Sequence, residues 1–232
     1  QKDNMAFATI DVTKGITGTT PVTQGGTGLT AGTTDQFLKF TGTTTLASAA
    51  DNSGLTLLQT VTASSSATVD ITGNFSSTYD NYIIYFNNVR CSNAPEYFGA
   101  RILTPSGSGT YWADSGSYGT VKIARRITGD GTSTDASTGD SQYNRIPLTV
   151  SSLENNGDWD LRGYVNIPYP LTSSYKYIEF MVLAGCPDDS ALMTYSTGAA
   201  NLYKNDNLTA IQFLPETGTI SAGTFKLYGI AK

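Results

Sequence analysis

The sequence contains no histidine and few charged side chains. Only 14% of its 232 residues are charged, whereas an ordinary soluble domain has roughly 25%. Without histidine, the chain cannot build a Ser-His-Asp or Cys-His catalytic arrangement, an imidazole metal site or a histidine pH switch. These absences exclude most of the familiar hydrolase mechanisms. We therefore expect no catalytic residues, no metal and no cofactor.

Positive charge and long apolar runs are also scarce. The chain has 14 Lys and Arg residues against 19 Asp and Glu residues, a formal net charge of -5. Nucleic-acid binding requires a basic face that neutralises phosphates, so we expect no nucleic-acid partner. No apolar run reaches the roughly 18 residues of a membrane helix, and the first residues lack the layout of a signal peptide. We expect a soluble protein without membrane insertion.

The chain has two cysteines, Cys91 and Cys186. Two are too few for a disulfide scaffold, and they lack the paired spacing of a zinc ribbon. Both adjoin apolar runs, so we interpret them as small buried hydrophobic residues. The sequence leaves open whether they form a disulfide.

Thr, Ser, Gly and aromatic residues occupy the positions that charged residues leave. There are 24 Gly, and aromatic residues make up 11% of the chain; this composition favours strands and turns and predicts an all-β fold. Residues 1–54 hold isolated apolar side chains between Thr, Gly, Ala and Ser, too few to bury a core. We predict an extended arm over residues 1–54, for attachment or trimerisation, that becomes ordered by packing on a partner.

Residues 55–232 show apolar runs separated by turn clusters, which is typical of a β-sandwich. The expected strands are 57–62, 67–72, 82–90, 98–104, 121–127, 146–151, 161–167, 175–184, 191–195, 209–214 and 224–230. Continuous apolar character at residues 82–86 suggests a strand that is buried on both faces. We expect the deepest burial at Ile84, Phe86, Phe180 and Val182. Residues 105–116 and 128–142 are expected to form long loops.

Two pairs of segments resemble known virion proteins. Residues 20–28 (TPVTQGGTG), followed by residues 35–42 (DQFLKFTG), resemble the Gly-Gly-Thr-Gly repeat of bacteriophage tail fibres and related virion proteins. Residues 75–84 and 221–229 look like the opening and closing strands of a jelly-roll-like domain that is common in phage fibre tips and capsid-surface proteins. The resemblance implies a homotrimeric virion protein whose N-terminal arm attaches or intertwines and whose β-sandwich is displayed outward.

Three aromatic residues mark the first candidate binding site. Tyr111, Trp112 and Tyr118 lie in or beside a Gly- and Ser-rich loop, where large aromatics are costly to expose unless they meet a ligand or a partner. We consider contact with a receptor or glycan, with subunit packing or a place in the local core as the alternative.

The second candidate binding site is Asp158-Trp159-Asp160. Two carboxylates that flank an aromatic ring can hold a sugar by stacking and hydrogen bonding. In the alternative interpretation, Trp159 caps the core and the two aspartates end a turn.

These observations together predict a structural or adhesive phage virion component that is not an enzyme. A tail fibre or receptor-binding tip that mediates host attachment is the first expectation. A capsid decoration protein with a surface-displayed β knob, or a non-catalytic carbohydrate-binding module, are the alternatives. The expected partners are two further copies of the chain, other virion proteins through residues 1–54, and a host-surface glycan or receptor.

Overall fold

The computed structural model describes residues 29, 32–34, 36–43, 45–49, 54–93, 97–107, 110–113, 117–128, 133–149, 160–185 and 191–230. Contacts divide the chain into two compact units, Gln1–Ser53 and Gly54–Lys232. This division lies one residue from the boundary expected from composition. Each unit is described by itself below.

The described part of the first unit contains one β-hairpin. Strand β1 (Phe37–Phe40) pairs antiparallel with β2 (Leu46–Ala49). The turn is closed by the Thr41 amide, which donates to the Thr45 carbonyl at 3.0 Å. Phe37 and Phe40 are 62% and 65% exposed. Two short strands cannot cover these rings, so the hairpin has no core of its own.

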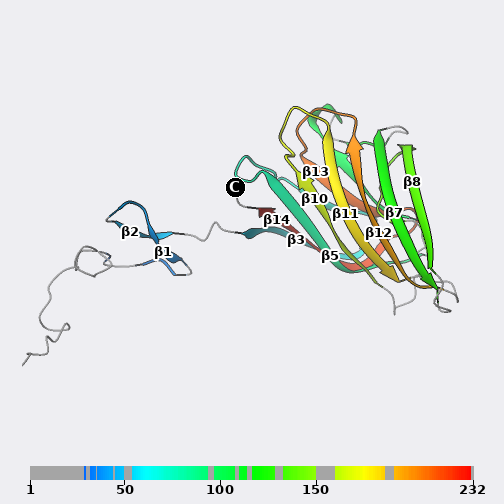
Figure 1. Cartoon of the computed structure of the whole chain (residues 1–232), viewed down its shortest axis with the longest axis horizontal. Coiled ribbons are helices and arrows are strands. Elements are labelled where there is room, and N and C mark those ends of the chain that lie inside the picture. Colours follow the sequence, from blue (N-terminus) through cyan, green and yellow to red (C-terminus); the bar gives the residue numbers. More distant parts are fainter. Residues whose placement is uncertain are drawn as a thin grey trace, which may run out of the picture. The chain divides into compact units, whose positions relative to one another are not determined.

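The described part of the second unit contains twelve antiparallel strands in two sheets. The strands are β3 (Leu55–Ser66), β4 (Val69–Thr72), β5 (Asn81–Cys91), β6 (Phe98–Leu103), β7 (Tyr118–Thr128), β8 (Ser133–Tyr143), β9 (Ile146–Pro147), β10 (Leu161–Pro168), β11 (Lys176–Gly185), β12 (Ala191–Leu202), β13 (Ala210–Pro215) and β14 (Ile220–Ile230), with a 3-10 turn, η2, at Pro105–Gly107. One sheet has the order β3-β14-β5-β10-β11-β12-β7-β8, and the other has the order β4-β13-β6-β9. Figure 1 shows β10, β11, β12, β7 and β8 side by side, with β13 behind them.

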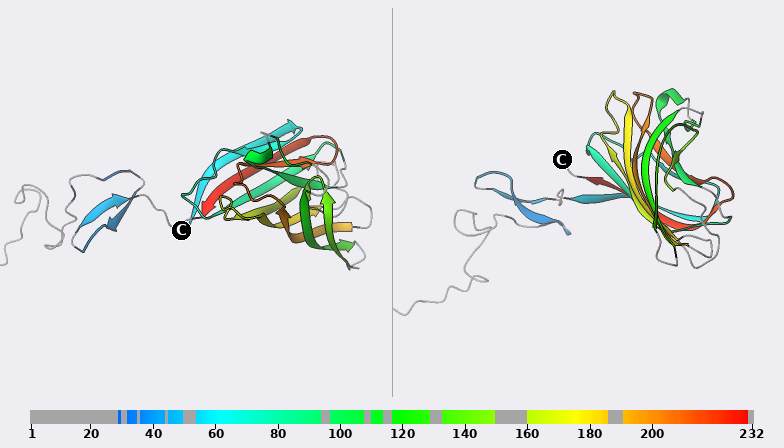
Figure 2. Two further views of the ribbon diagram at one scale, coloured as in Figure 1. Left: turned by 90° about the horizontal axis from the view of Figure 1, so that it is seen from above. Right: turned by 45° about the vertical axis from the view of Figure 1, so that its right-hand side comes forward.

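Eight of these strands have the order of a jelly roll. When β7, β8, β11 and β12 are left out, the remaining eight strands can be numbered 1 to 8 along the chain. The larger sheet then has the strand order 1-8-3-6, and the smaller sheet has the order 2-7-4-5. This is the double Greek key of the jelly roll. The all-β sandwich expected from the sequence is confirmed, and its strand order is that of the jelly roll implied by the resemblance. In the two further views of Figure 2, the strands of the smaller sheet lie on one side of the larger sheet.

Two inserted hairpins extend the larger sheet. The pair β7-β8 is inserted after β6, and the pair β11-β12 is inserted after β10. Both add to the same edge, so the order beyond β10 is β11-β12-β7-β8. The larger sheet therefore has twice as many strands as the smaller one and offers a broad outer face.

The core lies between the two sheets, where alternate residues of each strand point inward. Phe86 and Phe225 of the larger sheet meet Phe213 of the smaller sheet at ring-centroid distances of 5.8 and 5.0 Å. The residues expected at the greatest depth are confirmed there: Ile84, Phe86, Phe180 and Val182 are each at most 1% exposed. Cys91 is also buried, as expected, and its thiol is free, whereas Cys186 lies outside the described residues.

Two expectations about the strands are wrong. Residues 128–142 were expected to form a loop, but Ser133–Tyr143 forms β8 and pairs with β7 along most of its length. A strand at the sheet edge can form its ladder without the apolar side chains by which we identified strands. Residues 82–86 are not buried on both faces, because Ile83 and Tyr85 are only half-buried while their neighbours point into the core.

No helix in the described ranges is long and apolar enough to cross a membrane. The described residues also include no group of three or more Cys, Asp or Glu side chains that could hold a metal ion.

Candidate functional site

Tyr118 is a buried anchor. It is the first residue of β7 and is fully buried. Its hydroxyl accepts a hydrogen bond from the Ile102 amide at 2.8 Å and donates to the Trp112 carbonyl at 2.7 Å, and burial raises the pKa of the phenol above its ordinary value. The expectation that Tyr118 contacts a ligand from the surface is wrong, because its ring has no exposed face. It instead fixes the backbone of the preceding loop.

Trp112 packs on the domain. Its amide donates to the Ile102 carbonyl at 3.0 Å, and its indole Nε1 donates to Thr104 Oγ1 at 3.0 Å. The ring is partly buried against the core, and Lys204 Nζ lies 4.3 Å from its centroid, a cation-π contact. Among the interpretations considered for this loop, the structure supports a place in the local core for Trp112.

Tyr111 turns toward the smaller sheet. It is half-buried and hydrogen-bonded to Asp70 of β4, and burial together with this bond raises the pKa of its phenol. Asp70 also accepts hydrogen bonds from Thr68 Oγ1 and Gln212 Nε2, each at 2.9 Å. The phenol therefore already has a partner within the domain.

The second predicted site is described only at Asp160, because Asp158 and Trp159 lie outside the described residues. Both Oδ atoms of Asp160 accept from Arg162 Nη2 at 2.7 Å. Asp160 immediately precedes β10, where Leu161 pairs with Ala184, whereas Tyr118 pairs with Leu202 at the opposite end of the sheet. The structure therefore does not bring Asp160 together with the loop of Trp112.

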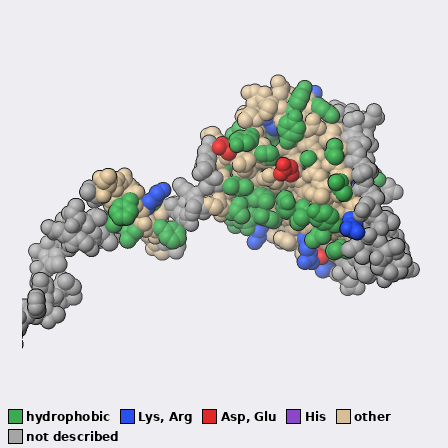
Figure 3. Space-filling view, viewed as in Figure 1, with side chains coloured by type: hydrophobic (Ala, Val, Ile, Leu, Met, Phe, Trp, Pro, Cys, Tyr) green, Lys and Arg blue, Asp and Glu red, His purple; other side chains and the backbone are tan. Residues whose placement is uncertain are grey.

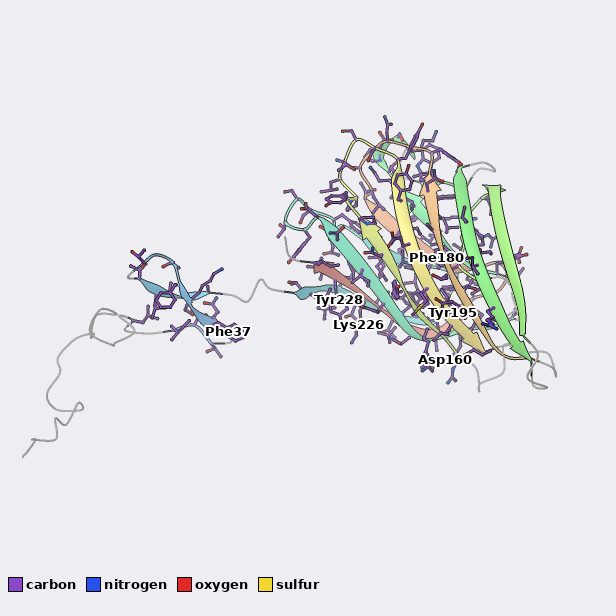
Figure 4. All side chains as sticks on the ribbon, viewed as in Figure 1. Phe37, Asp160, Phe180, Tyr195, Lys226 and Tyr228 are labelled. Atoms are coloured by element: carbon purple, nitrogen blue, oxygen red, sulfur yellow. The ribbon has the colours of Figure 1, made fainter. Side chains whose placement is uncertain are left out.

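The outer face of the larger sheet carries a set of tyrosines that our sequence analysis did not select. Alternation along the strands sends these side chains away from the core. We call this surface the tyrosine face; its tyrosines are Tyr85, Tyr164, Tyr177, Tyr195, Tyr203 and Tyr228. Figure 3 shows hydrophobic side chains, including tyrosine, spread over this face, and Figure 4 labels Tyr195, Tyr228 and Lys226 on it.

One row across the tyrosine face combines aromatic and aliphatic side chains with Lys226 and Thr197. Strand register aligns Lys226, Tyr85, Tyr164, Met181, Thr197 and Ile123 side by side. The ring of Tyr85 meets those of Tyr164 and Tyr228 edge-on, at centroid distances of 6.1 and 5.9 Å. Such pairs hold the rings in fixed orientations. Ile123 at the far end of the row is 58% exposed.

The next row has a polar centre. Register aligns Tyr228, Ile83, Asn166, Glu179, Ala199 and Val121. Asn166 Nδ2 donates to Glu179 Oε2 at 3.2 Å. The carboxylate and the amide therefore stand together among apolar neighbours. Because Asn166 Nδ2 satisfies only part of the acceptor capacity of Glu179, the carboxylate can accept further hydrogen bonds from a ligand.

A second pair of tyrosines borders this centre. Tyr177 is two residues from Glu179 on β11 and pairs with Asn201 of β12, which in turn pairs with Gly119. A Cβ atom at Gly119 would lie 2.5 Å from Asn201 Oδ1 and 2.6 Å from the Tyr203 hydroxyl. Any larger residue at position 119 would displace both side chains. Tyr175 supports Tyr203 edge-on, with ring centroids 6.1 Å apart.

The inner face of the extended sheet contains a buried lysine. Lys122 of β7 is 3% exposed. Its Nζ donates to the Thr149 carbonyl at 2.8 Å and lies 5.4 Å from the centroid of Tyr97. Burial lowers the pKa of this ammonium to about 8. Two buried hydroxyls of the same sheet, Thr120 Oγ1 and Ser196 Oγ, have no hydrogen-bond partner in the described structure.

No protein-family model matches the chain, and no curated protein sequence matches it. The tyrosine face could have been found from the sequence only through the strand pairing. Its tyrosines are scattered from position 85 to position 228, and no spacing along the chain connects them. The alternation at residues 177–183 was visible, but it could not show which neighbouring strands complete the surface.

Proposed function

We propose that the chain is a structural and adhesive phage virion component, a tail fibre or receptor-binding tip that displays its jelly roll outward and contacts the host. The tyrosine face is the observation that carries this proposal. It combines a fixed set of aromatic rings with a central carboxylate and amide, which suits recognition of a ligand. In the two rows that cross it, Glu179 is the only carboxylate, whereas glycoside hydrolysis ordinarily requires two. The proposed role is binding without catalysis.

The proposed assembly is a homotrimer joined through residues 1–54, which also attach to other virion proteins. The resemblance of residues 20–28 and 35–42 to tail-fibre repeats supports this role. The exposed rings of Phe37 and Phe40 support it independently, because intermolecular packing would shield them. Closed threefold symmetry would shield every copy equally.

Immunogold labelling of phage particles with an antibody against the second unit tests the proposal. Label at the tail tip is the expected result. Label over the whole head would refute the tail role and favour the capsid decoration protein. Particles that bind no label at all would refute a virion role. Light scattering on the full chain tests the assembly, and a stable monomer would contradict the trimer.

A further inference from the structure

The polar centre of the tyrosine face is unlike the centre of a protein interface. Charged residues are depleted at the core of interfaces between proteins. Glu179 is exposed, with neighbours on its own face that include Asn166, Tyr177, Met181 and Ala199. An apolar partner surface would remove this carboxylate from water with only one amide to compensate it, which is costly. A ligand that binds over Glu179 must therefore supply hydrogen-bond donors to its carboxylate.

The same centre supplies complementary hydrogen-bonding groups in close succession. Glu179 accepts, while Asn166 and Asn201 each both donate and accept. Asn166 pairs with Glu179 on one side, and Ala199 pairs with it on the other. Because Ala199 has a small side chain, a ligand can approach the carboxylate from above β12. Adjacent hydroxyl groups on a sugar ring can both donate and accept, so they could hydrogen-bond to these three side chains together.

The aromatic groups beside the centre are exposed and oriented. Tyr177 is 52% exposed and Tyr203 is 44% exposed. Tyr203 is held by Tyr175 and lies across Gly119, while Tyr177 stands next to Glu179 along β11. Each tyrosine offers a flat apolar ring with a polar tip. A ligand with an apolar ring face and a hydroxylated edge would stack on the rings while it hydrogen-bonds to Glu179.

We propose that Glu179, Asn166, Asn201, Tyr177 and Tyr203 form a binding site for a neutral saccharide. This inference rests on the proposed adhesive function and names the ligand class of that face. The carboxylate excludes anionic sugars, because a sialic or uronic acid would place like charges together. These five residues place the site on the face of the larger sheet and not in the loop of Trp112.

The test uses the full chain on an array of neutral, sialylated and uronic-acid oligosaccharides, followed by calorimetry with the neutral oligosaccharide that gives the strongest signal. Tyr177→Ala removes the stacking ring, and Glu179→Gln removes the charge-assisted acceptor. Each should weaken binding by about tenfold or more. Tyr177→Phe keeps the ring and should bind within about twofold of the wild type. Glu216→Gln, the same chemical change next to β13, is the matched control and should also leave binding unchanged.

Three results would overturn the inference. The first is the absence of binding to any neutral oligosaccharide, or a preference for acidic ones. The second is unchanged calorimetry for Tyr177→Ala and Glu179→Gln. The third is a change of oligomeric mass in Tyr177→Ala, which would assign the face to a second copy of the chain. Tail labelling of particles together with any of these results would refute the saccharide site alone, whereas the absence of label would refute the proposed function.

Discussion

Replacing the buried lysine of β7 provides a quantitative test of the packing under the extended sheet. Burial lowers the pKa of Lys122 from 10.5 to about 8. This lowering of the pKa by about 2.5 means that the protonated amine is ~3.4 kcal/mol less favourable in the folded state than in the unfolded state at pH 7. Lys122→Met keeps the length of the side chain and removes this penalty. It also removes the bond to the Thr149 carbonyl, which costs about 1–3 kcal/mol.

The pH dependence separates these two contributions. Between pH 8 and 10.5, the unfolded state binds more protons at Lys122 than the folded state, so wild-type stability rises with pH in this window. The variant lacks this rise. The stability of the wild type relative to Lys122→Met should therefore increase by up to ~3 kcal/mol between pH 8 and 10.5. At pH 7 the variant should be equal to the wild type or more stable by about 1–2 kcal/mol.

Urea unfolding of both proteins, followed by tryptophan fluorescence at intervals from pH 7 to 10.5, measures the difference. Subtraction cancels groups that both proteins share, including Cys91, whose pKa is raised to about 12 by burial. Lys39→Met, on the exposed hairpin strand β1, controls for the loss of one positive charge. A wild-type minus variant difference that stays constant over this range would refute the placement of Lys122 in a desolvated interior.

Three further changes test the core, the loop anchor and the arm. Phe180→Ala should destabilise the second unit by about 3–5 kcal/mol in urea unfolding, because its side chain is fully buried; a loss below about 1 kcal/mol would contradict that burial. Tyr118→Phe should cost about 1–3 kcal/mol, because the Ile102 amide and the Trp112 carbonyl lose their partner. Unchanged stability would mean that this hydroxyl is not an anchor. Replacing Phe37 and Phe40 together by Ser should lower the oligomeric mass in light scattering while the unfolding transition of the second unit is retained, and an unchanged mass would place the assembly contacts elsewhere.

The sequence predicted the parts of the fold that depend on local apolar patterning. The alternation at residues 177–183 correctly predicted a strand with Phe180 and Val182 inward. It could not predict β8, because the sequence of Ser133–Tyr143 is almost entirely polar and the strand is defined by its pairing with β7. The two strands are consecutive along the chain, so their pairing is local, but a polar segment carries no apolar alternation that would mark it as a strand.

The site illustrates a different limit. Our selection of Tyr111, Trp112 and Tyr118 rested on the flexibility of the surrounding sequence. The decisive facts were long-range contacts, namely the bond from the Ile102 amide to Tyr118 and the position of Lys204 over Trp112. Conversely, Tyr85 and Tyr164 are neighbours only because β5 and β10 are adjacent in the sheet. A surface that is assembled from several strands can be identified only after the strand order is known.

Binding of the fluorescently labelled full chain to a panel of bacterial strains, measured by flow cytometry, tests whether the tyrosine face mediates host attachment. The wild-type chain should stain at least one strain. Replacing Tyr177 and Tyr203 together by Ala should abolish the staining without changing the oligomeric mass or the unfolding midpoint, whereas Glu216→Gln should retain it. Equal staining by wild type and the double variant, or the absence of staining on every strain, would contradict a role of the tyrosine face in host attachment.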